Sequence, residues 1–346
     1  MTSYSTPIRD LSQATPDVGA PIPSSTSLKA ELPNYLDSTM ITCWRGCQRK
    51  FYNEFVLGLR PTGLSVDLHA GGCFALAVET VQRKMWEENL SFDTALLYAE
   101  AAFQVAWGDF EIPEFKKTSK TRDRMWEAVL DYFREYPPLT DPCPPYFDAS
   151  GKPTFEYTFA IPLTKTHSGR EFPMHPITGD PFLWTGRFDM LGNYMGRPTP
   201  RDDKTGGSIG SEWTSLWKLR NQFMGYVWAC RECGLDTEGV LVRGMGILKT
   251  EFKHAEVYQP FSQDLLDRWH EQLCNDIWEI VYSWKTEAWQ YDFADNCVTF
   301  FKPCMFMDAC TSSNPDAWLS QLEVRRWNPL LKNPVGATDP AKEHAL

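Results

Sequence analysis

Three charged residues near the middle of the chain have the types and spacing of a hydrolytic site. Asp189 lies in the segment GRFDMLG, and Asp202 and Lys204 lie in RDDKTGG, after a short Gly/Pro turn. If the two segments pair as a β-hairpin centred near Met195-Gly196, Asp189 and Asp202 lie opposite each other. Lys204 then shares the face of Asp202, while Asp203 points away. Two carboxylates this close favour a divalent cation, although a solvated hairpin with a salt bridge shows the same pattern.

The element after this hairpin is expected to be a helix, from about Thr214 to Cys233. Gln222 and Tyr226 stand one turn apart on one face of it. A glutamine and a tyrosine at this spacing suit a nucleotide phosphate or sugar, or simply a hydrogen bond to a neighbouring loop. The buried stripe of the same helix is expected to comprise Leu216, Leu219, Phe223, Val227 and Cys230.

The series GxxD, DxKT and Qxxx-Tyr resembles the nuclease core of the PD-(D/E)XK superfamily. The likeness is to its RecB-like branch, which includes CRISPR-associated exonucleases that hold an iron–sulfur cluster. The resemblance implies an α/β, restriction-endonuclease-like core, in which a mixed β-sheet is flanked by helices. It also implies that Asp189 and Asp202 ligate Mg²⁺ or Mn²⁺ and that Lys204 positions the attacking water. Gln222 and Tyr226 would face this site from the following helix.

One position departs from the pattern of this family. The segment LHAGGCFALAVETV is expected to form a Gly-Gly turn and then a helix, and Ala75 stands where many relatives place a metal-binding histidine. Glu79, one turn further along, could replace the histidine as a metal ligand, or it is a surface carboxylate. His69 is a weaker substitute. Glu156, at the start of a strand expected over Phe155 to Leu163, matches a family glutamate that supports the metal site, but an exposed strand carboxylate is an equal alternative.

Three cysteines near the C-terminal end suggest a second metal site. Cys297, Cys304 and Cys310 lie in the short segment NCVTFFKPCMFMDAC, and such thiolates suit an iron–sulfur cluster or zinc. The resemblance implies a [4Fe-4S] cluster with Cys47 as the fourth ligand, and Cys43 could replace Cys47. The gap between the first two of the three cysteines is wider than in the family. Unliganded thiols remain the alternative.

Two basic segments are candidates for contact with a nucleic-acid backbone. Arg45, Arg49 and Lys50 lie on a helix expected from Thr39 to Leu57, and Lys116 and Lys117 begin the stretch KKTSKTRDR. A solvated surface explains such charges as well. The net charge of −11 means that any DNA contact must be a local basic strip on an acidic body.

The composition bounds the organisation of the chain. With 346 residues, 42% of them hydrophobic, it can bury a substantial core. No apolar run spans a bilayer, no secretory signal is found, and ten cysteines then indicate a reducing compartment, so we expect a cytoplasmic protein. The resemblance implies a bacterial or phage origin. The expected parts are a tail (1–30), one nuclease domain (31–327) with a helical insertion (about 85–150) and a cysteine segment (about 290–312), and a second tail (328–346).

These observations predict a metal-dependent DNA nuclease of recombination, repair or processing, with exonuclease favoured over endonuclease. Its substrate would be single-stranded or end-bearing duplex DNA, and a helicase, recombinase or adaptation complex is a candidate partner. Ala75 and the acidic charge leave an alternative, in which a catalytically weakened nuclease fold acts as a nucleic-acid-binding or scaffold subunit. A third hypothesis makes the cysteines a redox or iron sensor.

Overall fold

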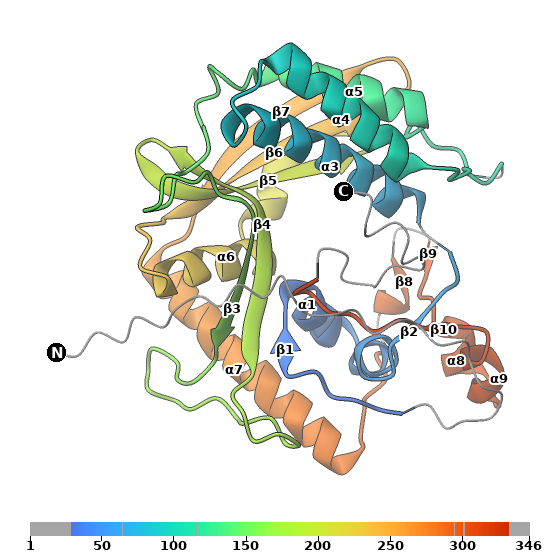
Figure 1. Ribbon diagram of the computed structural model, residues 1–346. Helices are drawn as coiled ribbons and strands as arrows, with labels where there is room; N and C mark the ends of the chain where they lie inside the picture. Colours follow the sequence, from blue (N-terminus) through green and yellow to red (C-terminus); the bar gives the residue numbers. More distant parts are fainter. Residues whose placement is uncertain (1–28, 64, 115, 294, 300–301, 332–346) are drawn as a thin grey trace.

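The fold is described from a computed structural model, which covers residues 29–331 except 64, 115, 294, 300 and 301 (Figure 1). Most of the two predicted tails therefore lies outside the described residues. At the centre is a mixed β-sheet with the strand order β1-β4-β5-β6-β7, in which β3 also pairs with β4. Its strands are β1 (Tyr35–Leu36), β3 (Phe155–Pro162), β4 (Leu183–Tyr194), β5 (Arg197–Gly206), β6 (Gly239–Ile247) and β7 (Phe252–Pro260).

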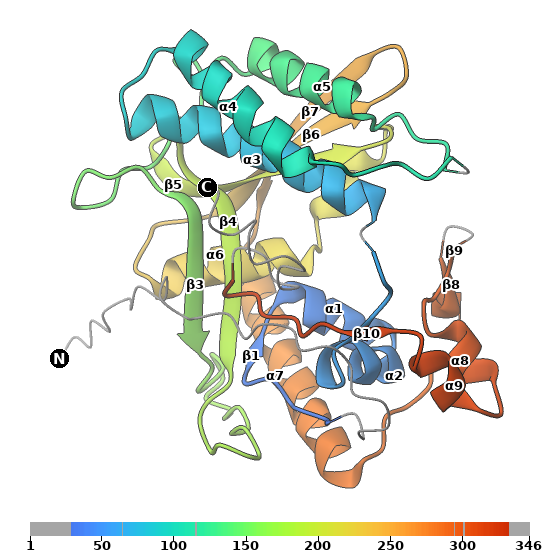
Figure 2. The same cartoon turned by 45° about the vertical axis from the view of Figure 1, so that its right-hand side comes forward.

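Helices cover both faces of this sheet (Figures 1 and 2). One face carries α3 (Val66–Trp86), α4 (Phe92–Trp107) and α5 (Arg122–Glu135), and the other carries α1 (Ser38–Gly46), α6 (Asn221–Glu232) and α7 (Gln263–Thr286). The expected α/β fold with a mixed, helix-flanked sheet is confirmed. The remaining elements are α2 (Gln48–Phe51), α8 (Met307–Thr311), α9 (Pro315–Leu319) and the short strands β2 (Leu59–Arg60), β8 (Val298–Thr299), β9 (Lys302–Pro303) and β10 (Glu323–Val324).

Two hydrophobic cores hold these layers together. The larger one joins α1, α6 and α7 to the sheet and includes Trp184, Phe223 and Leu273. The second lies within the α3–α5 layer and reaches the sheet through Met245 and Ile247 of β6. The helical layer of α3 to α5 therefore has an apolar core of its own, which continues into the sheet at the end of β6.

The β4–β5 hairpin forms as predicted. Met195 and Gly196 have φ angles of 53° and 81°, as a type I′ turn requires, and this turn matches the twist of the two strands. The ladder pairs Met190 with Arg201, so Asp189 and Asp202 occupy the next opposing position.

The helix predicted from Thr39 to Leu57 is interrupted. Cys47 has an extended backbone (φ −166°, ψ 115°), which ends α1 at Gly46, and its Sγ accepts a hydrogen bond from the Lys50 backbone N at 3.4 Å. A π-helical turn, Tyr52–Val56, follows α2. The thiol of Cys47 therefore caps the second helix, a role that side-chain periodicity does not reveal.

The predicted Gly-Gly turn is also wrong. The helix α3 begins at Val66 and runs through Gly71 and Gly72 without a break. A Cβ on Gly71 would lie 3.5 Å from Thr205 Oγ1 of β5, an ordinary van der Waals distance, and a Cβ on Gly72 would meet no atom within 4 Å, so the packing requires neither glycine.

The helix after the hairpin begins later than predicted. A 3₁₀ turn, Trp213–Trp217, comes first, and α6 starts only at Asn221. Leu216 and Leu219 are consequently 61% and 72% exposed rather than part of a buried stripe. In the part of the chain that the structure describes, no helix combines the length and apolar character that crossing a membrane requires.

A buried histidine on α7 provides a test of this packing. His270 lies against the rings of Phe172, Trp228 and Trp269, and burial lowers its pKa from 6.5 to about 4, an effect that nearby carboxylates offset only in part. The unfolded chain therefore binds a proton between about pH 6.5 and 4 that the folded chain does not, so stability falls as the pH drops through this window.

We expect His270→Phe to reduce the loss of unfolding free energy between pH 8 and pH 5 by about 1–2 kcal/mol. Urea unfolding at both pH values measures this loss. His167→Gln, which changes an exposed histidine, serves as the control and should keep the wild-type pH dependence. Equal pH dependence in wild type and His270→Phe would contradict the assignment.

Candidate active site

Three carboxylates lie in a row across β3, β4 and β5. Asp189 and Asp202 face each other on the hairpin. Glu156 of β3 lies on the other side of Asp189, because Phe155 pairs with Met190 and Tyr157 pairs with Phe188. Burial, followed by the negative charges of Asp202 and Glu156, raises the pKa of the Asp189 carboxyl well above its usual value. Asp202 itself is only 1% exposed. The site therefore concentrates negative charge that a cation would stabilise.

A lysine, a glutamine and a tyrosine complete the network around Asp202. Lys204 Nζ lies 2.6 Å from Asp202 Oδ2 and donates to Gln222 Oε1 at 3.3 Å. Gln222 Nε2 donates to Asp202 Oδ1 at 3.1 Å and to the Tyr226 hydroxyl at 2.7 Å. The Tyr226 hydroxyl in turn donates to the Arg187 carbonyl at 2.6 Å. The structure thus brings all five predicted catalytic residues together, while their catalytic roles remain predictions.

Close packing of α6 on β4 holds Gln222 and Tyr226 in place. A Cβ on Gly225 would lie 2.6 Å from Trp184 Cζ2, so only glycine lets the helix come this near to the strand. Gly186 of β4 leaves room for the Phe159 side chain of the neighbouring strand β3, because a Cβ there would lie 2.5 Å from the Phe159 ring.

Glu156 has a strained backbone at the edge of the site. Its φ is +49°, a left-handed conformation that is uncommon for a residue other than glycine. Its carboxylate forms an ion pair with Arg187 Nε at 2.7 Å, with only 18% of the side chain exposed. Of the two predicted alternatives, a residue near the metal site describes this position better than an exposed strand carboxylate does.

The donor set fits a hard divalent cation. Mg²⁺ keeps several water ligands and typically binds one or two protein carboxylates together with substrate phosphate oxygens. Asp189 and Asp202 supply this number of carboxylates. Within residues 29–331, gaps excepted, no three His, Cys, Asp or Glu side chains lie close enough to hold an ion by themselves. The site therefore fits a cation shared with substrate better than one enclosed by protein.

The substitutes for the missing family histidine have other contacts. Ala75 is exposed on α3. Glu79 accepts from Arg83 Nε at 2.6 Å, and Arg83 also donates to the Phe155 carbonyl at 3.2 Å. His69 stacks on Phe110 with ring centroids 4.0 Å apart. A role for Glu79 in metal binding stays a prediction, and the ion pair with Arg83 competes with it.

The segments that carry the four predicted cluster cysteines meet, since Asn296 Nδ2 donates to the Gly46 carbonyl at 3.2 Å, but within the described residues no three of these thiols are placed to hold one metal ion. Partial burial and the charges of Cys304 and Cys47 raise the pKa of Cys297, and burial followed by the same two neighbours raises that of Cys310. The Cys304 backbone N donates to the Cys297 carbonyl at 2.8 Å, so the pairing of β8 with β9 brings these two residues together. The alternative ligand Cys43 instead lies 4.0 Å from a Glu54 oxygen.

The predicted basic contacts near the N-terminus are largely engaged within the protein. Arg45 Nη2 forms an ion pair with Asp276 of α7 at 2.7 Å. The Arg49 guanidinium lies over two tyrosine rings, at 5.3 and 5.4 Å from their centroids. Lys50 lies 3.9 Å from a glutamate one turn along the chain. These three residues therefore already have partners within the protein, around α1 and α2.

The second basic segment lies in the loop between α4 and α5. Lys116 Nζ lies 3.9 Å from Asp67 Oδ2, and Lys117 is exposed. Lys120, from the same loop, is buried and forms an ion pair with Asp67 at 3.3 Å. Of this stretch, Lys117 is the residue whose exposure best suits contact with a backbone phosphate.

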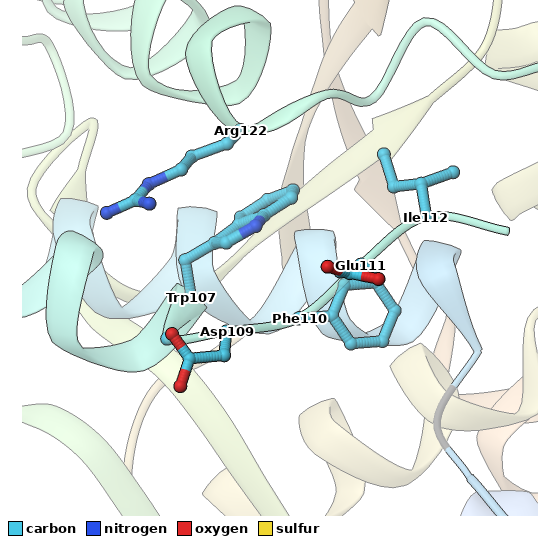
Figure 3. Close-up of a pocket in the computed structure, with 7 residues that line it drawn as sticks. Trp107, Asp109, Phe110, Glu111, Ile112 and Arg122 are labelled. Carbon is cyan, nitrogen blue, oxygen red and sulfur yellow. The ribbon is translucent and has the colours of Figure 1, made fainter. Parts of the chain in front are cut away.

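A pocket of about 400 Å³ lies between the end of α4 and the start of α5 (Figure 3). None of the predicted catalytic or cluster residues belongs to it. Its walls are Trp107, Gly108, Asp109, Phe110, Glu111, Ile112 and Arg122.

A buried charged network on the other face of β5 was not predicted from the sequence. It contains Arg201 and Arg243, each 1% exposed, and pairs them with Asp141 and Asp203. The alternation in RDDK placed Arg201 and Asp203 on a common face, which was the one available signal. Asp141 lies in the Pro-rich connection over residues 137–145, which offers no periodic pattern that would assign its side chain a face.

Two opposed carboxylates with a lysine on a mixed, helix-flanked sheet define the core of a nuclease. The sequence profile of the PD-(D/E)XK nuclease superfamily matches residues 39–311. The chain belongs to this superfamily.

Other comparisons add only distant similarity. One solved structure, of a candidate exonuclease from Eubacterium rectale, has 12% identity over 81% of this chain and 94% of its own, with a TM-score of 0.43. Another, of the protein SSO0001, has 14% identity over 70% of this chain and 76% of its own, with a TM-score of 0.27. No curated protein sequence matches the chain.

The packing of α6 gives a direct prediction. Replacing glycine by alanine in a helix normally stabilises it, but the close contact with Trp184 should make Gly225→Ala destabilising by about 1–3 kcal/mol. Urea unfolding measures the change. Gly210→Ala is the matched control, because a Cβ there would meet no atom within 4 Å. An unchanged or higher stability for Gly225→Ala would show that the helix does not sit this close to β4.

Proposed function

We propose that this nuclease hydrolyses phosphodiester bonds in DNA with Mg²⁺ or Mn²⁺. The observation that carries the proposal is the row of Glu156, Asp189 and Asp202, with Lys204 at 2.6 Å from Asp202. A bound divalent cation polarises the scissile phosphate and lowers the pKa of a water molecule. Asp189 and Asp202 would hold the cation on the face shared with Lys204.

Lys204 is the residue best placed to act on the reacting phosphate. Its side chain is 32% exposed and therefore accessible to substrate, while contacts with Asp202 and Gln222 orient its ammonium group. It would stabilise the negative charge that grows on the phosphate oxygens and orient the attacking water. Gln222 is itself fixed by Tyr226, whose raised pKa, due to burial and the charges of Asp202 and Asp189, keeps its hydroxyl a neutral donor.

The finer functional assignment follows the resemblance of the motifs. It favours an exonuclease on single-stranded or end-bearing duplex DNA in recombination, repair or processing. A cytoplasmic location and a helicase, recombinase or adaptation-complex partner belong to the same proposal, as does a single nuclease domain over 31–327. Ala75, which is exposed, stands where many relatives place a metal-binding histidine, and this supports one alternative, in which the nuclease fold serves nucleic-acid binding without efficient cleavage.

Cleavage of end-labelled DNA tests the catalytic proposal. Asp202→Asn and Lys204→Ala should each lower the rate by about 10²-fold or more, because each removes charge aimed at the reacting phosphate. Chelation by EDTA should abolish cleavage, and Mg²⁺ or Mn²⁺ should restore it.

The control is Glu279→Gln, which neutralises an exposed carboxylate on α7 and should cleave at the wild-type rate. Binding of DNA without cleavage under any divalent cation would favour the alternative of a binding subunit. Full activity of Asp202→Asn would contradict the proposed site.

We also propose that Cys47, Cys297, Cys304 and Cys310 bind a [4Fe-4S] cluster. The charges of Cys304 and Cys47 contribute, after burial, to the raised thiol pKa values of Cys297 and Cys310, and a hydrogen bond joins Cys304 to Cys297; both observations support this set. Burial, followed by the carboxylate of Glu54, disfavours a thiolate at Cys43, which supports Cys47 as the fourth ligand. Such a cluster would join the start of α2 to the C-terminal segment. Unliganded thiols, zinc and a redox-sensing role are the competing hypotheses.

Iron analysis of anaerobically purified protein tests the cluster. Wild type should contain about four iron atoms per chain, and Cys304→Ser should lose most of them. Cys233→Ser is the control: it replaces an exposed cysteine that directly follows α6, and this variant should retain the iron. Zinc in place of iron in the wild-type protein, or full iron content in both variants, would contradict the assignment.

A further inference from the structure

Asp203, next to the catalytic strand residues, belongs to a buried row of charges on the opposite face of the sheet. In register across β5, β6 and β7 lie Asp203, Arg243 and Glu256. Arg243 Nε donates to Glu256 Oε2 at 2.7 Å. The row lies behind the site, on the face that α3 and α5 cover (Figure 1).

The helical layer reaches this row through a tyrosine. Tyr132 of α5, which is 2% exposed, donates its hydroxyl hydrogen to Asp203 Oδ1 at 3.0 Å. Arg201 Nη2 donates to the other oxygen, Asp203 Oδ2, at 3.2 Å. Both oxygens of Asp203 are therefore fixed, one by the neighbouring helix and one by its own strand.

Asp141 completes the network from the Pro-rich connection after α5. It accepts from Arg243 Nη1 and Nη2 at 2.7 and 2.6 Å, and Arg201 Nη1 lies 3.6 Å away. Burial alone would raise the pKa of Asp141, but hydrogen bonds from Arg243 and the charge of Arg201 hold it below its usual value. The carboxylate therefore stays ionised, and both arginines keep a buried counter-charge.

A direct link connects this network to the carboxylates of the site. The backbone N–H of Asp203 donates to Asp189 Oδ2 at 3.0 Å. One residue thus has its side chain anchored on the far face and its amide directed at the near face. Because Asp202 and Lys204 flank it in sequence, its position also sets theirs.

We propose that Asp203 is a positioning residue for the metal carboxylates, held in place by Tyr132 of the helical layer. Its anchored side chain keeps the peptide N–H aimed at Asp189, which fixes the carboxylate in one orientation for the cation. Loss of the Tyr132 hydroxyl leaves Asp203 held from one side only, and Asp189 loses part of its orientation. This inference rests on the proposed metal-dependent function and names residues that support it.

The test measures Mn²⁺ binding to the full-length protein without DNA, by electron paramagnetic resonance of free Mn²⁺. Tyr132→Phe should weaken Mn²⁺ affinity about three- to tenfold, since it removes the hydrogen bond to Asp203, and with it the longer one that Arg243 Nη1 donates to the hydroxyl at 3.4 Å, without opening a cavity. Asp203→Asn should weaken it at least as much. The double variant should be no weaker than Asp203→Asn, because the two residues act through one path.

Tyr136→Phe is the matched control. Tyr136 directly follows α5, one helical turn after Tyr132. The centre of its ring lies 4.0 Å from the Arg243 guanidinium carbon, and phenylalanine retains this ring. It should bind Mn²⁺ as wild type does. If Tyr132→Phe binds Mn²⁺ normally and only melts at a lower temperature, the network is structural and the proposal is wrong. Equal weakening by Tyr136→Phe, or additive effects in the double variant, would also overturn it.

Two outcomes separate this proposal from the proposed function. A wild-type protein that binds Mn²⁺ but does not cleave DNA would refute the nuclease activity, while weaker Mn²⁺ binding by Tyr132→Phe would still support the positioning role. A wild-type protein that binds no divalent cation would overturn both. If Asp203→Asn does not fold, Tyr132→Phe alone decides, because it removes no charge.

Discussion

The close approach of Glu156, Asp189 and Asp202 on three adjacent strands determines which cations and which strand register the fold needs. Like charges at this separation repel, and burial strengthens the repulsion, as the raised pKa of Asp189 shows. The protein compensates with Lys204 against Asp202 and Arg187 against Glu156. A short hairpin with a type I′ turn fixes the register, because a one-residue slip would send Asp202 to the other face.

The alternation of β5 gives its two faces different tasks. One face presents Asp202 and Lys204 to the site, and the other presents Arg201 and Asp203 to a buried ionic network. Buried charges are unfavourable unless they are paired, so the network stabilises the fold less than apolar packing of the same volume would. Its contribution is geometric, since it specifies where the strand lies relative to the helices that cover it.

Each helical layer contributes to the site in its own way. On one side α6 supplies Gln222 and Tyr226, and its contact through Gly225 sets their height above the sheet. On the other side α5 supplies Tyr132, which reaches the site only through Asp203. The cysteine-rich segment lies with α1 and α2, and the proposed cluster would staple elements that are far apart in sequence.

The sequence by itself determined the parts of the site that depend on local geometry. Strand alternation and the Met195-Gly196 turn were sufficient to place Asp189 opposite Asp202, and helical spacing put Gln222 and Tyr226 on one face. The same local rules failed at Cys47, at Gly71 and Gly72, and at Leu216 and Leu219. At these positions a thiol cap, a helix that continues without a break and a late helix start decided the structure.

Only the tertiary structure decided the contacts between distant segments. The pairing of Asp141 with Arg201 and Arg243, and of Tyr132 with Asp203, joins residues that are separated by 60 or more positions. A single sequence carries no periodic signal for such pairs, because their partners are chosen by burial and charge compensation after the layers have packed. Local backbone geometry therefore defined the face that carries Asp189, Asp202 and Lys204, and packing defined what supports this face from behind.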